Sequence, residues 1–407
     1  MSFSQGLSGL NASASNLDVI GNNIANAGTM GFKSGSVQFS DVFTGSQVGL
    51  GAKVASVSQN FNAGAVQTSA RALDVAIVEG DGFFRMTSPG GEIAYSRNGQ
   101  FNKDRDGFIV NAAGLQLTGH QVDAAGVAGV GLVALRLPST AMVPKATGEI
   151  KAQFNLDARG TIPTAAFDAN NAATYNYSNS VKVYDSLGNP HELATFFVKT
   201  SPIVPSAWAV YATADGAAVN VTAPPNGTGQ LTFNEYGKLL TPTDGKLELN
   251  GIDFNNGSAP MTLAVAVTGT TQFGSASDVK QLDQDGYASG TLAGFSIGKD
   301  GTVTGKYSNE QVKTMGQIVL SSFVNPAGLQ SKGDNVWTET AASGQALTGN
   351  PGAGTKLGAL ASGSLETSNV DLTSELVNLI IAQRTYQANA QTVKTQDQVV
   401  QTLMNIR

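Results

Sequence analysis

The chain has 407 residues, a formal net charge of −6 and a sequence pI of about 5.0. Charged residues make up only 13% of it, and it contains no cysteine. The acidic balance argues against a nucleic-acid partner. The lack of cysteine excludes disulfides, thiol nucleophiles and thiolate metal sites. The length permits two or three domains with cores of their own.

Mean hydropathy is −0.04, and no apolar run approaches the ~20 residues of a membrane span. The first positive charge is Lys33, and no continuous apolar core precedes it. A cleaved secretory signal and membrane insertion are therefore not expected. The protein either stays in the cytoplasm or leaves the cell by a route that needs no cleaved signal.

The first segment, residues 1–28, is predicted to be a helix, because apolar residues recur at heptad spacing from Phe3 to Ile24. Gly6, Gly9 and Gly21 interrupt it, and each glycine costs a helix up to about 1 kcal/mol relative to alanine. We expect this helix to form only when its apolar stripe is buried. Its small residues would let a neighbouring helix come very close.

The next segment, residues 29–70, has few charges and no clear periodicity. It is predicted to be an extended connecting arm. From Arg71 onward, short alternating runs are separated by Asn98-Gly99, Asp106-Gly107 and similar pairs, which is typical of β-hairpins. An inner all-β domain is predicted from residues 71–144 and 280–358, and an outer all-β domain from 145–279.

The last segment, residues 359–407, contains the clearest pattern of the chain. From Leu372 to Met404, apolar residues recur in an unbroken 4-3-4-3 spacing in which only Gln383 and Asp397 are polar. This predicts a helix from Ser368 to Arg407, roughly 60 Å long at 1.5 Å per residue. Asn369 or Ser368 is expected to cap it.

The predicted fold class is therefore α+β and multidomain, with paired N- and C-terminal helices of coiled-coil type flanking nested all-β domains. Two amphipathic helices beside an ordinary core remain an open alternative. The apolar residues of both stripes form the predicted assembly interface, which consists of Phe3, Leu7, Leu10, Leu17, Ile24, Leu372, Leu376, Leu379, Tyr386, Val393, Val400 and Met404.

No catalytic, metal or cofactor site is expected. The two histidines, His120 and His191, are interpreted as surface or turn residues. Residues 349–356 (GNPGAGTK) resemble a phosphate-binding loop, but the lysine is one place late and no Ser or Thr follows it. Residues 102–107 resemble a calcium loop without its final glutamate and are interpreted as a β-turn. The protein is not expected to be an enzyme.

Several motifs resemble those of the bacterial flagellar rod and hook protein family. Residues 23–33 (NIANAGTMGFK) are similar to its N-terminal motif, and residues 365–372 (LETSNVDL) and 383–389 (QRTYQAN) to its C-terminal motif. Residues 74–84 (DVAIVEGDGFF) and 95–99 (YSRNG) are similar to its shared β domain.

Three further motifs resemble the hook members specifically. They are VYDSLGN at 183–189, QDGY at 284–287 and YSN at 307–309. Two departures are Gly28, where Asn is common, and Glu310, where Gly is frequent. Rod members share both ends but lack the insertion at about 145–280.

The resemblance implies a structural subunit that polymerises into a hollow, bendable tube outside the cell, where it acts as a universal joint transmitting torque from rod to filament. It implies no cofactor. The implied partners are further hook subunits, the distal rod protein, the hook cap, the hook–filament junction protein, the hook-length ruler and the type III export apparatus.

Two other functions are compatible with parts of this sequence. A distal rod subunit is disfavoured by the length of the insertion. A β-rich adhesin or glycan-binding protein with helical oligomerisation tails would need exposed aromatic platforms, and Trp208 and Trp337 are the only tryptophans.

Overall fold

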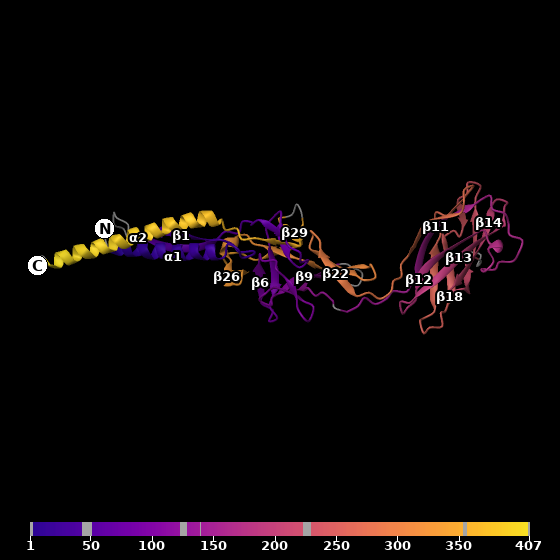
Figure 1. Cartoon of the computed structure of the whole chain (residues 1–407), viewed down its shortest axis with the longest axis horizontal. Coiled ribbons are helices and arrows are strands. Elements are labelled where there is room, and N and C mark those ends of the chain that lie inside the picture. The colour runs from indigo at the N-terminus through magenta and orange to yellow at the C-terminus, as the bar shows by residue number, and fades with distance from the viewer. Residues whose placement is uncertain are drawn as a thin grey trace. The chain divides into compact units, whose positions relative to one another are not determined.

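The computed structural model describes residues 3–42, 51–122, 128–138, 140–222, 229–352 and 356–405. It is mostly β, with one long helix near each end of the chain (Figure 1). Helix α1 spans Phe3–Ala25 and helix α2 spans Leu372–Asn405. The chain separates into two compact units. Unit 1 comprises Met1–Ser139, Ala293–Lys306 and Val312–Arg407, and unit 2 comprises Thr140–Leu292 and Tyr307–Gln311.

The C-terminal helix begins later than predicted. Asp371 is the capping residue, because its Oδ1 accepts hydrogen bonds from the backbone N–H of Thr373 (2.9 Å) and Ser374 (3.3 Å). A hydrogen bond from the Ser374 hydroxyl (2.8 Å) and these two backbone bonds lower the pKa of the Asp371 carboxyl. Residues just before it, predicted to belong with the helix, form strands β29 (Ala359–Ser362) and β30 (Ser364–Glu366) instead.

Those two strands tie the C-terminal segment to the N-terminal half of unit 1. β29 pairs antiparallel with β4 (Val75–Val78), and β30 pairs antiparallel with β3 (Val66–Thr68). A third two-stranded sheet joins β1 (Gly35–Asp41) to β2 (Ala52–Gln59). The predicted extended arm is thus partly a hairpin, stabilised by its own ladder.

A thirteen-stranded sheet system holds most of the described strands of unit 1. Its members are β5 (Phe83–Thr87), β6 (Ile93–Ser96), β7 (Asn102–Lys103), β8 (Ile109–Val110), β9 (Gln116–Val122), β10 (Ala128–Ala134), β22 (Leu292–Ile297), β23 (Thr302–Tyr307), β24 (Val312–Ile318), β25 (Leu320–Ser322), β26 (Gln330–Gly333), β27 (Val336–Thr338) and β28 (Leu347–Gly349). Strands from both sides of the unit 2 insertion pair here, as β9 does with β24. Fully buried Val75, Phe84 and Leu117 lie in the core.

Unit 2 is built on an eleven-stranded sheet system. Its members are β11 (Glu149–Asp157), β12 (Tyr177–Tyr184), β13 (Pro190–Ser201), β14 (Ser206–Ala214), β15 (Ala217–Thr222), β16 (Gln230–Phe233), β17 (Leu239–Thr241), β18 (Lys246–Ile252), β19 (Met261–Ala266), β20 (Thr271–Phe273) and β21 (Asp278–Gln284). β21 pairs with β11, so this unit extends beyond the predicted limit at residue 279.

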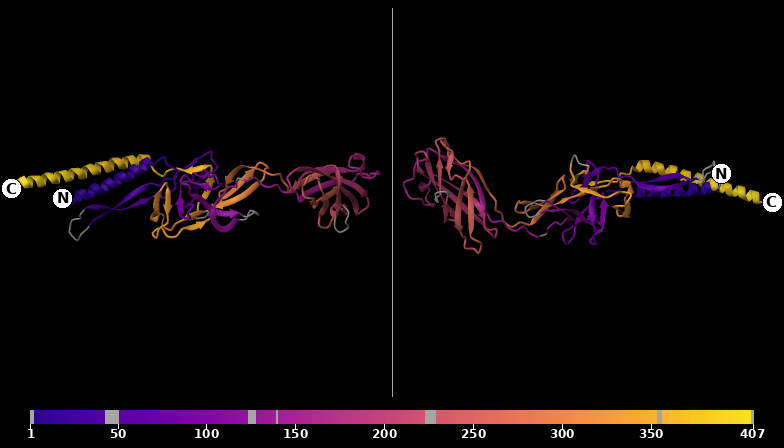
Figure 2. Two further views of the ribbon diagram at one scale, coloured as in Figure 1. Left: turned by 90° about the horizontal axis from the view of Figure 1, so that it is seen from below. Right: turned by 180° about the vertical axis from the view of Figure 1, so that it is seen from behind.

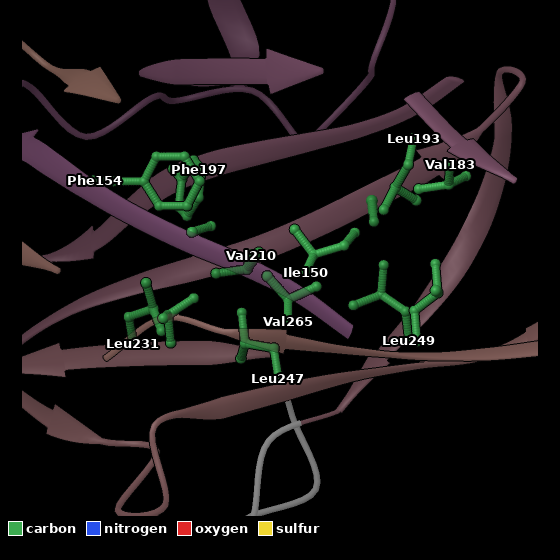
Figure 3. Packing of buried hydrophobic residues seen from close by; sticks show 14 of the residues in the cluster. Ile150, Phe154, Val183, Leu193, Phe197, Val210, Leu231, Leu247, Leu249 and Val265 are labelled. Atoms are coloured by element: carbon green, nitrogen blue, oxygen red, sulfur yellow. The ribbon is translucent and has the colours of Figure 1, made fainter. Parts of the chain in front are cut away.

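The core of unit 2 forms where apolar side chains of different strands point toward one another (Figure 3). Phe154 on β11 and Phe197 on β13 meet with ring centroids 4.9 Å apart. The period-2 alternation that predicted the strands puts these residues on inner faces, as in β19, where Met261, Leu263 and Val265 are buried.

The predicted turns are largely present. Gly107 and Gly301 have φ values of +92° and +81°, a region that glycine favours. Asn250-Gly251 is different, because β18 continues through it with a bulge. Glu310, where the related motif carries Gly, has a φ of +63°. Apart from α1 and α2, the helices in the described residues are the short 3-10 turns η1 (Ala172–Thr174) and η2 (Pro326–Gly328).

Candidate assembly interface

The two terminal helices lie side by side and antiparallel (Figures 1 and 2). Near the start of α1, a Cβ added at Gly6 would lie 2.8 Å from Cγ2 of Val393. Near its end, Asn23 Nδ2 donates a hydrogen bond of 3.3 Å to Oε1 of Glu375. The last residues of α2 therefore extend past the first described residue of α1, as Figure 2 also shows.

The contact between the helices uses the small and polar residues of α1. Gly6, Ser13 and Asn23 are buried, and a Cβ added at Gly9 would lie 2.9 Å from the side-chain amide of Asn389. Asn389 also donates a hydrogen bond of 3.4 Å to the Ser13 hydroxyl. The expected close approach of a neighbouring helix is confirmed, with the chain's own α2 as that neighbour.

The two predicted apolar stripes do not face each other. Phe3 and Leu7 on α1, and Leu372, Leu376, Tyr386, Val400 and Met404 on α2, remain exposed, with exposed fractions from 40% to 73%. Leu10, Leu17, Ile24, Leu379 and Val393 are half-buried. The reason is steric, because the glycine and serine side of α1 allows closer packing than its leucine side. The α2 face toward α1 is shifted to include Glu375, Ala382 and Asn389.

The β1–β2 hairpin runs along α1. At one end, Asn23 Nδ2 donates to the carbonyl of Gly35 (2.8 Å) and Asn23 Oδ1 accepts from its N–H (2.9 Å). At the other end, a Cβ added at Gly51 would collide with the Ser8 hydroxyl. The hairpin and the two helices together line an open groove of about 550 Å³.

This groove has a mixed lining. Apolar walls come from Ile20, Phe39 and Ile381, and Glu375 is the charged residue among the described lining positions. The remaining lining residues are Gly9, Ala12, Ser13, Asn16, Val19, Asn23, Gly35, Ser36, Val37, Ala52, Asn378, Ala382, Thr385 and Asn389. A surface of this kind suits an amphipathic helix.

The terminal motifs meet at the base of the helix pair. Asn369 accepts a hydrogen bond from the backbone N–H of Ser34 (2.8 Å), and its Nδ2 donates to the carbonyl of Asn60 (2.7 Å). Gly31, with a φ of +69°, donates its N–H to the Glu366 carbonyl (2.8 Å). The motif residues thus connect the chain after α1 with the chain before α2.

A buried charge cluster lies in the same region. Lys33 Nζ is 2.6 Å from Glu366 Oε1, and Arg97 Nη1 is 3.7 Å from Glu366 Oε2. Burial lowers the pKa of Lys33, and its hydrogen bond to Glu366 partly opposes that change. Burial also lowers the pKa of Arg97. The sequence did not predict that Lys33 and Glu366 form a pair, although both residues lie in the terminal motifs.

A second polar cluster lies in unit 2 and corrects the interpretation of His191 as a surface or turn residue. Its side chain is 10% exposed, its Nδ1 is 2.7 Å from Asp215 Oδ2 and its Nε2 is 3.2 Å from Asp185 Oδ2. The ring stacks on Phe254 with centroids 3.5 Å apart. Asp185, in the VYDSLGN motif, is fully buried and also accepts a hydrogen bond from Asn256 (2.7 Å). The cluster connects the loops that follow β12, β14 and β18, which carry Asp185, Asp215 and Asn256.

The described part of the chain contains no group of three or more His, Asp or Glu residues placed to hold a metal ion. No described helix is long and apolar enough to cross a membrane.

Residues 102–110 form the β7–β8 hairpin, with Asp104 Oδ1 accepting from the N–H of Asp106 (2.9 Å). The phosphate-loop-like segment at 349–356 includes residues 353–355, which lie outside the described residues. Trp208 and Trp337 are both buried.

Four family models match the chain. They are the flagella basal body rod protein model at residues 5–33, the flagellar hook protein FlgE/F/G D1 domain at 77–164, the flagellar basal body protein FlaE D2 domain at 155–287 and the flagellar basal body rod FlgEFG protein C-terminal model at 361–406. Together they span most of both units.

Full-length relatives have the same description. The flagellar hook proteins FlgE of Salmonella typhimurium and Escherichia coli are each 46% identical over 100% of both chains. That of Borreliella burgdorferi is 33% identical over 100% of this chain and 99% of its own. The fold is similar to the crystal structure of Helicobacter pylori flagellar hook protein FlgE2, with a TM-score of 0.54 and 13% identity over 74% of this chain and 100% of that chain.

Proposed function

This chain belongs to the flagellar hook protein family and is a structural subunit of the hook, and we propose that it self-assembles through its two terminal helices into a hollow, bendable tube. The observation that supports this assembly route is the exposed apolar surface of α2. Leu376, Val377, Ile380 and Ile381 lie within two turns of α2, and each is 46% to 58% exposed. Contiguous exposed apolar surface on a soluble protein marks an interaction site.

The helices of neighbouring copies are the proposed partners of this surface. Burying a Leu or Ile side chain contributes about 1.5–3 kcal/mol, so a few such residues repeated in every subunit would stabilise a polymer strongly. Contacts between different patches of identical chains generate a helical filament when the rotation between neighbours does not close into a ring. In the assembled tube, α1 and α2 would pair in a coiled-coil manner, with the predicted stripe residues Leu10, Leu17, Leu379 and Val393 buried more completely than in one chain.

The remaining parts of the chain would form the outer layers. We propose an inner and an outer β domain, predicted from the sequence as 71–144 with 280–358 and as 145–279. The proposed outer domain includes all of β21, because β21 pairs with β11 in unit 2. Their surfaces are low in charge, so contacts between copies can exchange as the tube bends and acts as a universal joint. Mild proteolysis of the purified chain should remove the terminal helices before it cuts the β units, and cleavage inside unit 2 first would contradict this division.

The further partners are proposed from family membership. They are the distal rod protein, the hook cap, the hook–filament junction protein, the hook-length ruler and the type III export apparatus, and the proposed location is outside the cell. An enzymatic role is not part of the proposal, because this is a family of structural flagellar proteins.

Electron microscopy of the purified full-length chain at high concentration tests the proposal. Hollow tubes are expected from the full-length chain. A chain that ends before Leu372 should keep its β units folded and remain monomeric. Discrete closed oligomers from the full-length chain, or tubes from the truncated chain, would contradict assembly through the terminal helices.

A further inference from the structure

The C-terminal end of α2 projects beyond α1. Exposed residues fill this end, at positions 397–402 and 404. Three of them are apolar: Val399, Val400 and Met404. Gly6, in the first described turn of α1, already lies opposite Val393. The segment Asp397–Asn405, called here the projecting end, extends roughly 12 Å further at 1.5 Å per residue.

The projecting end continues the face of α2 that packs on α1. That face includes Glu375, Ala382, Asn389 and Val393. Heptad steps continue it to Gln396 from Asn389 and to Val400 from Val393. Within one chain, this stretch of the face has no helix beside it in the described residues. The contact face of α2 therefore continues beyond the part that α1 covers.

The groove lined by α1, α2 and the hairpin has matching chemistry. It combines apolar side chains such as Ile20, Phe39 and Ile381 with amides such as Asn16 and Asn378, and its volume is about 550 Å³. The projecting end likewise carries Val399, Val400 and Met404 among Gln398, Gln401 and Thr402. Each surface offers the other apolar contacts and hydrogen-bonding groups. The projecting end carries one acidic residue, Asp397, and the groove carries another, Glu375.

We propose that the projecting end of α2 from one subunit occupies the groove of a neighbouring subunit. This inference rests on the proposed function, and it names the surfaces that meet. A protruding segment and a groove at different positions of the same helix pair form a head-to-tail contact, which builds a filament when the rotation between copies does not close. Met404 lies 26 positions after Asn378, so parallel copies displaced by roughly 40 Å along the helices would bring the two together.

The chain lacks cysteine, so disulfide crosslinking between single-cysteine variants tests the contact directly. Met404→Cys places a thiol on the projecting end, and Asn378→Cys places one at the groove. Gln387→Cys is the matched control, because Gln387 is also exposed on α2 but does not line the groove. Equal amounts of two variants are polymerised together, oxidised and resolved by mass under non-reducing conditions.

The Met404→Cys and Asn378→Cys pair should give at least tenfold more mixed dimer than the Met404→Cys and Gln387→Cys pair. If tubes form but the two pairs crosslink equally, the groove contact is wrong while the proposed function stands. If the unmodified chain forms no tubes, both fall together. As a second measurement, Met404→Lys and Asn378→Asp should each slow polymerisation, and combining them should restore it through the new ion pair.

Discussion

Lys33 and Glu366 lie 333 positions apart in the chain and form a buried ion pair of 2.6 Å. Lys33 follows α1, and Glu366 ends β30 just before α2. Lys33 Nζ also donates to the Asn62 carbonyl (2.7 Å), and Glu366 Oε1 also accepts from the N–H of Gly64 (2.8 Å). The pair therefore fixes the bases of both helices to the same β framework.

Replacing Lys33 with methionine should strongly destabilise unit 1. The change leaves Glu366 buried without its close cation, and breaking a buried pair in this way costs about 3–5 kcal/mol of unfolding free energy. Urea unfolding followed by circular dichroism measures it. The matched control is Lys332→Met, which breaks the exposed ion pair with Glu92 and should cost less than about 1 kcal/mol. Equal losses in the two variants would show that the buried pair has no special role.

The stability of unit 2 should depend on pH through His191. Burial would lower the pKa of His191, but its hydrogen bonds to Asp215 and Asp185 outweigh this and raise it above the ordinary 6.5. Only the protonated ring can donate to both carboxylates. Its contribution is therefore fully present below pH 6.5 and is lost as pH rises through the folded pKa.

The two carboxyls act in the opposite direction. Burial would raise the pKa of Asp185, but hydrogen bonds from Asn189, Asn256 and His191 lower it below 3.8, and hydrogen bonds from His191 and the Glu192 N–H similarly lower the pKa of Asp215. Their contributions are present above pH 3.8 and are lost as pH falls through the folded values. Maximum stability is expected between these limits. In thermal melts, His191→Gln should remove the decline above pH 6.5, whereas His120→Gln should keep it.

The small residues of α1 give a further prediction. Gly6→Leu should separate the helices and reduce polymerisation, because even a Cβ there would lie 2.8 Å from Val393. Gly21 is the matched control, since a Cβ there meets nothing within 4 Å. Gly21→Ala should stabilise α1 by up to about 1 kcal/mol through helix propensity alone. Polymerisation kinetics by light scattering distinguish them, and unchanged kinetics for Gly6→Leu would contradict the close packing.

The sequence predicted both helices and the β middle because each depends on local periodicity. It did not predict which faces of α1 and α2 meet. Heptad apolar spacing pointed to Leu7 and Leu376, whereas close approach at Gly6 and Gly9 decided the contact. That choice depends on the distance between two backbones, which no single segment specifies. A stripe of small residues at positions 6, 9 and 13 was the available signal.

The ion pairs were also beyond sequence reasoning. Lys33 and Glu366 come together only because β3 pairs with β30, and Asp185, His191 and Asp215 only because the loops around β13 and β14 meet. The contacts of Lys33 with Glu366 and of His191 with Asp215 depend on strand pairing, whereas Asp185 and His191 flank the turn between β12 and β13, six positions apart. The family motifs include Lys33, Glu366 and Asp185, but a motif does not indicate which residues its members contact.

The exposed apolar residues of α2 lead to the last prediction. Leu376→Asp or Ile380→Asp should abolish polymerisation, because each places a charge on a surface that must become buried between subunits, while a single chain leaves both residues about half exposed. The free energy of unfolding of the monomer should therefore stay within about 0.5 kcal/mol of that of the unmodified chain. Thermal melts of the monomers measure it. Val312→Asp is the control, since Val312 is 65% exposed on β24, away from the helices, and it should still form tubes. Sedimentation and electron microscopy measure assembly. A large loss of monomer stability in the α2 variants would mean that these side chains already lie in a folded core, whereas tubes of normal length would mean that neighbouring subunits do not cover them.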